Sequence, residues 1–227
     1  MRGFRAVEGR YVAELDGTER EVLATVVADV AELLGAGRFD TDVRSREGAD
    51  AAEAPHPLLG LRMSPVDVPA PIDPAVHRLL PDASQEDPEL AAEFRRLTEG
   101  DLRRLKVERL RMLWQALVGE ARGSGDATTP HDVGGADLAV PRGEAAALAA
   151  TITDLRLVLA ERLGVESDED SDALYEALDR HELGEEDPDR SGRELVEDEI
   201  RDYLGSVYAA LSWLQESLVA AMMEDLS

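Results

Sequence analysis

The fold class is decided by residues 18–34, TEREVLATVVADVAELL, whose apolar side chains recur at the spacing of one helical face. The recurring positions are Val22, Val26, Val30, Leu33 and Leu34. Thr18 and Glu21 have the spacing of a capping box, in which a hydroxyl and a carboxylate satisfy backbone donors at a helix start. Gly35 and Gly37 follow, and glycine is the residue that most often ends a helix. We therefore predict an α-helix here.

The same period returns along the chain and predicts a mainly α-helical fold. Further helices are expected over 73–80, 87–117, 141–163, a short stretch around Leu174 and Leu178, and 191–226. The helix from 87 is carried by Leu90, Phe94, Leu97, Leu102, Leu105, Leu110, Leu113, Trp114 and Leu117. That helix is either continuous or broken near Thr98-Glu99-Gly100, with Thr98 as a second cap. The last helix is either one helix or two helices joined at Gly205.

A small β element is expected at the N-terminus. Residues 4–15 alternate weakly, with Phe4 and Ala6 on one arm, Tyr11, Ala13 and Leu15 on the other, and Glu8-Gly9 at the turn. Residues 137–140 offer a third short strand beside this hairpin. The predicted architecture is a helical bundle with a small N-terminal β-hairpin and, as an option, that third strand. It forms one domain over 1–227, and linker-like composition predicts mobile segments near 40–56 and 122–136.

Charge is distributed unevenly along the chain. The sequence holds 24 Lys and Arg against 49 Asp and Glu, a formal net charge of −25. Residues 1–122 have a net charge of −6 and residues 123–227 a net charge of −19, so the second half is a polyanion. Such a surface attracts cations and basic proteins and repels phosphate backbones. We expect no direct binding to nucleic acid by the chain alone.

Several classes of chemistry are excluded or left without support. The chain has no cysteine, which rules out disulfides, thiolate nucleophiles and cysteine-ligated metal sites. Nucleophile elbows, Walker loops, dinucleotide fingerprints and His-Glu-x-x-His are absent, and Ser124 lies in linker composition. We therefore predict a protein that is not an enzyme, with no catalytic, cofactor-binding or metal-binding residues and no cofactor. No signal-like or membrane-spanning apolar stretch is found, which predicts a cytoplasmic protein.

Two groups of side chains were weighed as metal ligands. The histidines at 56, 77, 131 and 181 lie in different segments and are expected at the surface or at helix ends, with His77 partly buried. Asp168-x-Asp170-x-Asp172 matches the first positions of a calcium loop, but Ala173 replaces the required glycine and Asp179 the final glutamate. The favoured interpretation is an acidic helix start stabilised by the helix dipole.

Two helices carry features that point to contacts. Residues 94–118 form the only basic segment, and its arginines and lysine are expected to pair inside the protein with the acidic half. The last helix is unusually apolar, with Trp213, Leu211, Leu214 and Leu218 expected in the core. Its apolar positions cover more than one stripe, so a second face is expected to bury against another helix or a second subunit.

Three stretches together resemble the actinobacterial oxidative-stress-responsive regulator family (AosR-like). They are Phe-x-x-x-x-Gly-x-Tyr at 4–11, DLRLVLAERLGV at 154–165 and WLQESLV at 213–219. The resemblance implies a cytoplasmic accessory transcription regulator. A family member forms an intramolecular disulfide under oxidative stress, associates with an extracytoplasmic-function sigma factor and raises expression of an alternative cysteine-biosynthesis pathway. Because this chain has no cysteine, that switch is impossible here and no functional residue is carried over.

The function expected from these observations is a non-enzymatic accessory transcription regulator in the oxidative-stress response. It would act through protein–protein contacts, with a sigma factor or RNA polymerase as the partner, and without a membrane. One alternative is a structural homo-oligomerisation module that dimerises through the last helix. The other is a carboxylate- or metal-dependent hydrolase, for which a carboxylate-ringed pocket would be the signature.

Overall fold

The computed structural model describes residues 1–37, 39, 71–119, 137–182 and 192–225. Within them the strands are β1 Arg2–Val7, β2 Arg10–Glu14 and β3 Asp137–Pro141. The helices are α1 Gly17–Leu33, α3 Pro74–Leu79, α4 Pro88–Gly119, α5 Ala145–Leu163, α6 Asp168–Glu182 and α7 Gly192–Glu224, with a 3₁₀ turn η3 at Arg142–Glu144. The predicted mainly α fold with a small sheet is confirmed. The proposed mobile segments at 40–56 and 122–136 lie outside the described residues, and the single-domain organisation stays a prediction.

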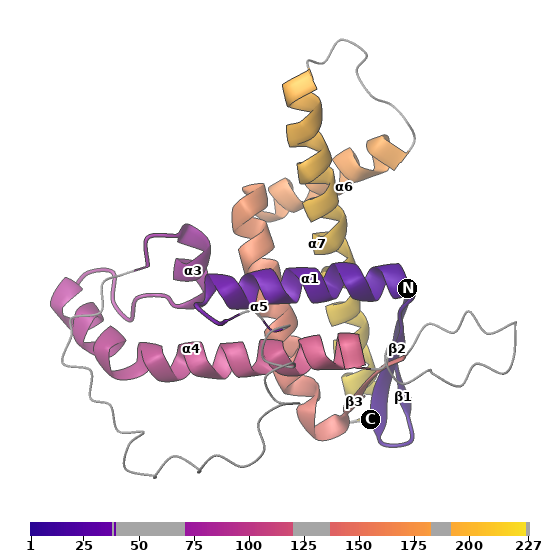
Figure 1. Cartoon of the computed structure of the whole chain (residues 1–227), viewed down its shortest axis with the longest axis horizontal. Helices are drawn as coiled ribbons and strands as arrows, with labels where there is room; N and C mark the ends of the chain where they lie inside the picture. Colours follow the sequence, from indigo (N-terminus) through magenta and orange to yellow (C-terminus); the bar gives the residue numbers. More distant parts are fainter. Residues whose placement is uncertain (38, 40–70, 120–136, 183–191, 226–227) are drawn as a thin grey trace, which may run out of the picture.

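Two pairs of antiparallel helices cross each other to form the core. Figure 1 shows α1 and α4 side by side, with α5 and α7 running across them, and contacts join α4 and α1 to α5. Buried apolar side chains from these four helices, from α3 and α6 and from the sheet form one cluster. Among the described helices, none combines the length and apolar content needed to cross a bilayer.

The N-terminal hairpin and the third strand are both present. Glu8 and Gly9 have φ values of 43° and 82°, which the two-residue turn of a right-twisted hairpin requires. The strand order is β1-β2-β3, and both neighbouring pairs are antiparallel, with Tyr11 opposite Val140. The Phe4 backbone N–H donates to Ser217 Oγ at 3.0 Å, which ties β1 to α7. Residues 213 positions apart in the sequence are therefore in direct contact.

The start of α1 differs from the prediction. Asp16 caps the helix: its side chain accepts from Glu19 N at 2.9 Å, and Glu19 Oε2 accepts from Asp16 N at 2.8 Å. The capping box predicted at Thr18 and Glu21 is wrong by two residues. Both pairs have the required spacing, but the earlier one lengthens the helix and places a carboxylate at its positive end.

The two long helices, α4 and α7, are each continuous, with no break at Thr98–Gly100 or at Gly205. Thr98 does not recap α4, because its hydroxyl donates to Phe94 O at 2.8 Å inside an unbroken helix. Gly205 lies within α7, where a Cβ would come 3.0 Å from the Leu174 side chain, so its small size permits the close approach of α6. Pro141 ends β3 and does not open a helix; α5 begins after η3.

Two arginine side chains join α1 to α4, one near each end of α1. Arg20, near the start of α1, is only 4% exposed and donates to Ala116 O and Leu117 O near the end of α4. Arg103 of α4 donates to Leu34 O at the end of α1 at 3.0 Å. Carbonyls in the last turn of a helix lack intrahelical donors, so each guanidinium caps the other helix. The antiparallel arrangement of the pair makes this exchange possible.

One helix cap predicts a pH dependence of stability. Asp73 accepts from Arg162 at 2.6 Å and from Ala75 N at 2.9 Å, and the Arg162 hydrogen bond, aided by the backbone, lowers the pKa of this carboxyl. A folded-state pKa below the unfolded value of about 3.9 stabilises the fold at neutral pH, and this is lost as pH falls through the folded pKa. Asp73→Asn should therefore be less stable than wild type at pH 7. Urea titrations should show the difference shrinking towards pH 3; a constant difference would contradict the assignment.

Candidate functional site

The outer face of α4 carries an exposed apolar stripe. It consists of Leu90, Phe94, Leu97, Leu105 and Met112, which are 45%, 48%, 60%, 42% and 48% exposed. At about 100° per residue these five side chains fall within roughly a quarter of the helix circumference. We call this set the outer stripe. The sequence predicts that Leu90, Phe94, Leu97 and Leu105 carry this helix; the helix is present, and these four residues lie on its exposed face.

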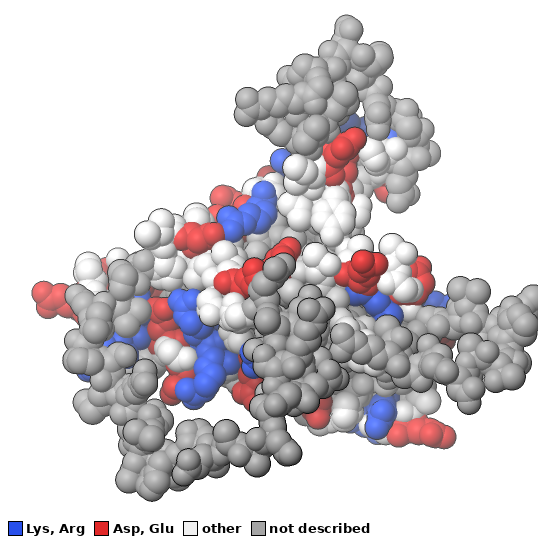
Figure 2. Space-filling model, viewed as in Figure 1, with Lys and Arg blue, Asp and Glu red and all other residues white. Residues whose placement is uncertain are grey.

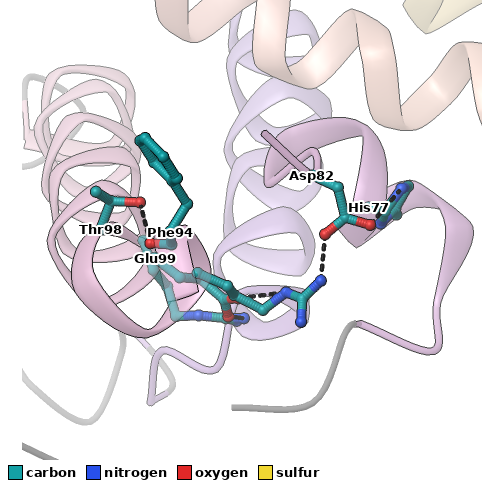
Figure 3. Close-up of polar contacts among 7 residues, drawn as sticks. His77, Asp82, Phe94, Thr98 and Glu99 are labelled. Atoms are coloured by element: carbon teal, nitrogen blue, oxygen red, sulfur yellow. Dashed lines mark hydrogen bonds and ion pairs between the residues drawn. The ribbon is translucent and has the colours of Figure 1, made fainter. Parts of the chain in front are cut away.

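The face of α4 that points into the protein carries charges over the same turns. Figure 3 shows Glu99, which is 8% exposed, in contact with arginines on either side of it along the helix. Arg103 donates to Glu99 Oε1 at 2.7 Å, and Arg95 Nε lies 3.8 Å from Glu99 Oε2. Arg95 also contacts Asp82, whose other oxygen is 4.0 Å from His77 Nε2. The network joins α4 to α3 and to the segment that follows it.

This arrangement reverses the usual polarity of a surface helix. A surface helix normally turns its apolar stripe to the core and its charges to water. Here the inward charges are compensated by one another, as buried charges must be to avoid a large desolvation penalty. Glu99 Oε1 accepts a hydrogen bond from Arg103, whereas Oε2 is buried and has no hydrogen-bond partner among the described residues. The network therefore holds the charged face of α4 against α3 and the segment that follows it, and leaves its apolar face exposed to solvent.

A small apolar pocket continues the outer stripe at its C-terminal end. It has a volume of about 110 Å³ and lies between α4, β3 and the start of α5. Its lining includes Arg109, Met112, Ala116, Leu138, Val140 and Ala147. Met112 belongs to both the stripe and the pocket. Pockets for cofactors and drug-sized ligands are typically about 300–1,000 Å³, so this one has the size for a single large side chain.

Comparison with known proteins identifies a family. The family model described as "Domain of unknown function (DUF2017)" matches residues 1–222. The chain belongs to this family. The match covers every described strand and helix except the last residues of α7. No curated protein and no solved structure matches the chain.

The residues weighed as metal ligands are not brought together. His77 is partly buried in α3, as predicted, and His181 is exposed on α6 with Nδ1 3.2 Å from Asp202. The histidines at 56 and 131, and Ser124, lie outside the described residues. Across the ranges that the structure describes, no group of three or more His, Asp or Glu side chains is placed to hold a metal ion.

The acidic run at 168–172 forms the first turn of α6. Asp170 accepts from Ser167 Oγ at 2.8 Å, from Ser167 N at 2.9 Å and from Glu166 N at 3.0 Å. The Ser167 hydroxyl and these backbone donors lower the pKa of the Asp170 carboxyl. Asp168 lies with it in the first turn. The favoured interpretation, an acidic helix start, is confirmed, because the carboxylate that a calcium loop would need is used as a cap.

The basic segment contributes internal ion pairs, and among the described pairs the one between Lys106 and Asp154 has its partner in the acidic half, as predicted. Lys106 Nζ lies 2.6 Å from Asp154 Oδ1 of α5, and the two side chains are only 14% and 9% exposed. Arg95 and Arg103 belong to the network described above. Arg104, in contrast, is 74% exposed and pairs with Asp101, which is 77% exposed. In Figure 2 the largest group of Lys and Arg side chains lies over α4.

The place of Trp213 differs from the prediction. Leu211, Leu214 and Leu218 of α7 are fully buried, but Trp213 is 42% exposed and lies beside β1 near Gly3. One helical position separates it from buried neighbours, which is enough to rotate it out of the core. The buried tryptophan is Trp114 of α4, which is 6% exposed. Burial of a second face of α7 against another subunit stays a prediction.

Proposed function

We propose that this protein is a non-enzymatic regulator that acts by binding another protein on the outer stripe of α4. The observation that supports this proposal is the reversed polarity of α4 between Leu90 and Leu105. Exposed apolar side chains grouped on one helix face, here with Asp101 and Glu108 between them, are typical of protein-interaction sites, whereas single exposed apolar residues are ordinary. The network around Glu99 keeps the helix in this orientation at the expense of apolar burial in the core.

The resemblance to AosR-like regulators suggests the partner. We propose an extracytoplasmic-function sigma factor, alone or bound to RNA polymerase, and a role as a cytoplasmic accessory regulator of transcription in the oxidative-stress response. A polyanionic chain that meets a transcription complex through a protein surface does not need to hold DNA itself. Control of the interaction by a disulfide is impossible, because the chain has no cysteine.

The test is a calorimetric titration of the full chain with a purified extracytoplasmic-function sigma factor from the same organism. Leu97 is the most exposed residue of the outer stripe, so Leu97→Asp should keep the fold and weaken binding at least 10-fold, as loss of a central interface residue does. Val219→Asp on α7 is the matched control, since Val219 is 41% exposed and lies off α4. Equal binding by Leu97→Asp and wild type would refute the docking surface.

A homo-oligomer is the second candidate, favoured by the exposure of Ile200, Tyr203 and Trp213 on α7. Sedimentation equilibrium separates the two. Under the lead proposal the purified chain is monomeric or its dimer is unaffected by Trp213→Asp. A dimer that Trp213→Asp converts to a monomer would favour the oligomerisation module.

Duplex DNA should not bind to the protein alone. The net charge of −25 denies the chain the release of counterions that drives binding of basic proteins to DNA. Fluorescence anisotropy of a labelled duplex at low salt should show no saturable binding up to micromolar protein. Saturable binding without a partner protein would contradict this expectation.

Peroxide should leave the fold and the oligomeric state unchanged at doses that switch thiol-based sensors. Methionine is the slower target that remains, and the exposed Met112 and Met223 are the side chains to follow by mass spectrometry. A change in oligomeric state that is reversed by methionine sulfoxide reductase would reveal a methionine switch instead.

A further inference from the structure

We infer that the segment bound on the outer stripe is a basic amphipathic α-helix of the partner protein, anchored by one large apolar side chain in the pocket beside Met112. The inference rests on the proposed function and adds the chemistry of the partner segment.

The shape of the surface matches a helix lying along α4. From Leu90 to Met112 the outer stripe extends over 22 positions, which is about 33 Å of helix at 1.5 Å per residue. Leu90, Phe94 and Leu97 are spaced by four and three residues, which is the spacing of a seam between two packed helices. A straight helix of about 20 residues therefore covers the whole stripe with anchors at i, i+3, i+4 and i+7.

The pocket gives the helix a fixed register. Its volume of about 110 Å³ suits one apolar side chain, and its walls come from three elements, α4, β3 and α5. Met112, at the rim, is 48% exposed. A central or terminal anchor that enters a well-formed apolar pocket is the usual way in which a few residues supply most of the binding energy. The partner must therefore carry a Leu, Phe or Met at this end of its apolar face.

Two carboxylates within the stripe determine the charge of the partner. Counted at about 100° per residue, Asp101 and Glu108 lie in the same sector of α4 as Leu90 and Phe94. Both are exposed, and they are seven residues apart, so they face the same side of a partner helix. Among the described residues Asp101 pairs with the equally exposed Arg104, and none of them pairs with Glu108. A helix packed on this seam needs Lys or Arg opposite both positions.

The charge of the whole chain favours the same partner. A net charge of −25 accelerates the approach of a basic segment and opposes that of an acidic one. A second copy of the chain would bring the same net charge and the same two carboxylates to the contact. Arg104 beside the stripe already pairs with Asp101. The preference for a basic helix from another protein therefore rests on the two carboxylates within the stripe and on the charge of the whole chain, and not on the charge of α4 as a whole.

The test is a selection from a phage-displayed library of 21-residue helices. Apolar anchors are kept at heptad spacing, and the flanking positions are varied among Lys, Glu, Gln and Ala. Selection on the wild-type chain should enrich Lys, above all in pairs seven residues apart. Enrichment of Glu, indifference to charge, or no enriched helix at all would overturn the inference.

Variants of the chain then separate the effect of the charges at Asp101 and Glu108 on peptide binding from the effect of net charge. With the best selected peptide, fluorescence anisotropy should show at least 10-fold weaker binding to Asp101→Lys/Glu108→Lys, which should prefer the Glu version of that peptide. The control Glu176→Lys/Glu224→Lys makes the same change in net charge on exposed positions of α6 and α7 and should weaken binding less than 3-fold. Equal loss in both double variants would overturn the assignment of Asp101 and Glu108.

Two further measurements test the side chain that enters the pocket and the identity of the segment that covers the outer stripe. Ala147→Phe fills the pocket from α5 and should weaken the peptide at least 10-fold; unchanged binding would overturn the anchor. A wild-type dimer that Leu97→Asp makes monomeric would mean that a second copy covers the stripe, which overturns the inference. Failure here is distinguishable from failure of the proposed function: if sigma-factor binding requires Leu97 but acidic helices are selected, only the charge of the partner is wrong.

Discussion

Asp154→Ala should lower the free energy of unfolding by about 3–5 kcal/mol, because it leaves the Lys106 ammonium buried without its partner. The pair joins α4 to α5 at 2.6 Å, with both side chains almost fully inside the protein. Its loss should loosen the contact between the α1–α4 pair and the α5–α7 pair. Urea denaturation followed by circular dichroism measures the change directly.

Two controls test whether the loss comes from the unpaired charge. Lys106→Met/Asp154→Leu removes both charges and keeps apolar volume, so it should recover most of the stability. Asp101→Ala breaks the pair with Arg104 on the exposed surface of the same helix, where an ion pair contributes little. If Asp154→Ala unfolds at the wild-type urea concentration, Lys106 is not held by this pair and the role assigned to it is wrong.

Trp114→Ala should be as costly, with a loss of about 3–5 kcal/mol expected for truncation of a buried tryptophan. Trp114 is 6% exposed, and its ring lies 5.6 Å from that of Phe39 at 58°, while the Arg111 guanidinium is 5.2 Å from the Phe39 ring centre. Alanine leaves most of the volume of the indole empty beside the Phe39 ring. The melting temperature should fall by many degrees.

The second tryptophan is a matched control. Trp213 is 42% exposed, so Trp213→Ala should cost about 1 kcal/mol, the average for a point substitution. Trp213→Phe leaves Trp114 as the only tryptophan, and the tryptophan emission should be that of a buried indole in the folded protein. If Trp213→Ala destabilises the fold more than Trp114→Ala, the two tryptophans have been assigned to the wrong environments.

The reversed polarity of α4 also explains why Asp154→Ala and Trp114→Ala both weaken the attachment of α4 to the rest of the protein. The large buried apolar residues of α4 lie in its C-terminal third, where Leu110, Leu113, Trp114 and Leu117 enter the core, and Ala91 is the buried apolar residue of its first turn. Over the preceding turns the helix is held by polar links, namely the Glu99 network, Arg103 on Leu34 O and Lys106 on Asp154. Substitutions in either set should release α4, whereas substitutions in the outer stripe should affect binding alone.

The local elements could be predicted from the sequence, because their signals are local. Apolar spacing, the Glu8-Gly9 turn and the Asp-Pro caps place the hairpin and all six helices of the described residues, and residues 137–140 supply the third strand. Errors at this level are small: the cap of α1 is two residues early, and α5 starts after η3. Each follows from overlapping signals, since two capping boxes fit the start of α1 and Pro141 suits a strand end as well as a helix start.

The orientation of α4 could not be predicted in the same way. Its sequence contains two apolar stripes, one through Leu90, Phe94 and Leu97 and another, on nearly the opposite side, through Leu110, Leu113 and Leu117. A break near Gly100, which the sequence also allows, would turn both stripes to one core. Long-range partners decide against it. Asp82, Leu34 O and Asp154 hold the charged face inward, and these contacts join residues that only the tertiary structure brings together.

The amino-acid sequence therefore determined the helical class, the sheet, the absence of thiol chemistry and the polyanionic character, because these depend on local spacing and on composition. The tertiary structure decided which faces are left exposed: the outer stripe on α4, the pocket beside Met112 and the outward position of Trp213. Amphipathic period alone cannot make that choice when a helix has two apolar faces. The compensation of buried charges by distant partners makes it, since an unpaired charge inside the protein costs more than an exposed leucine.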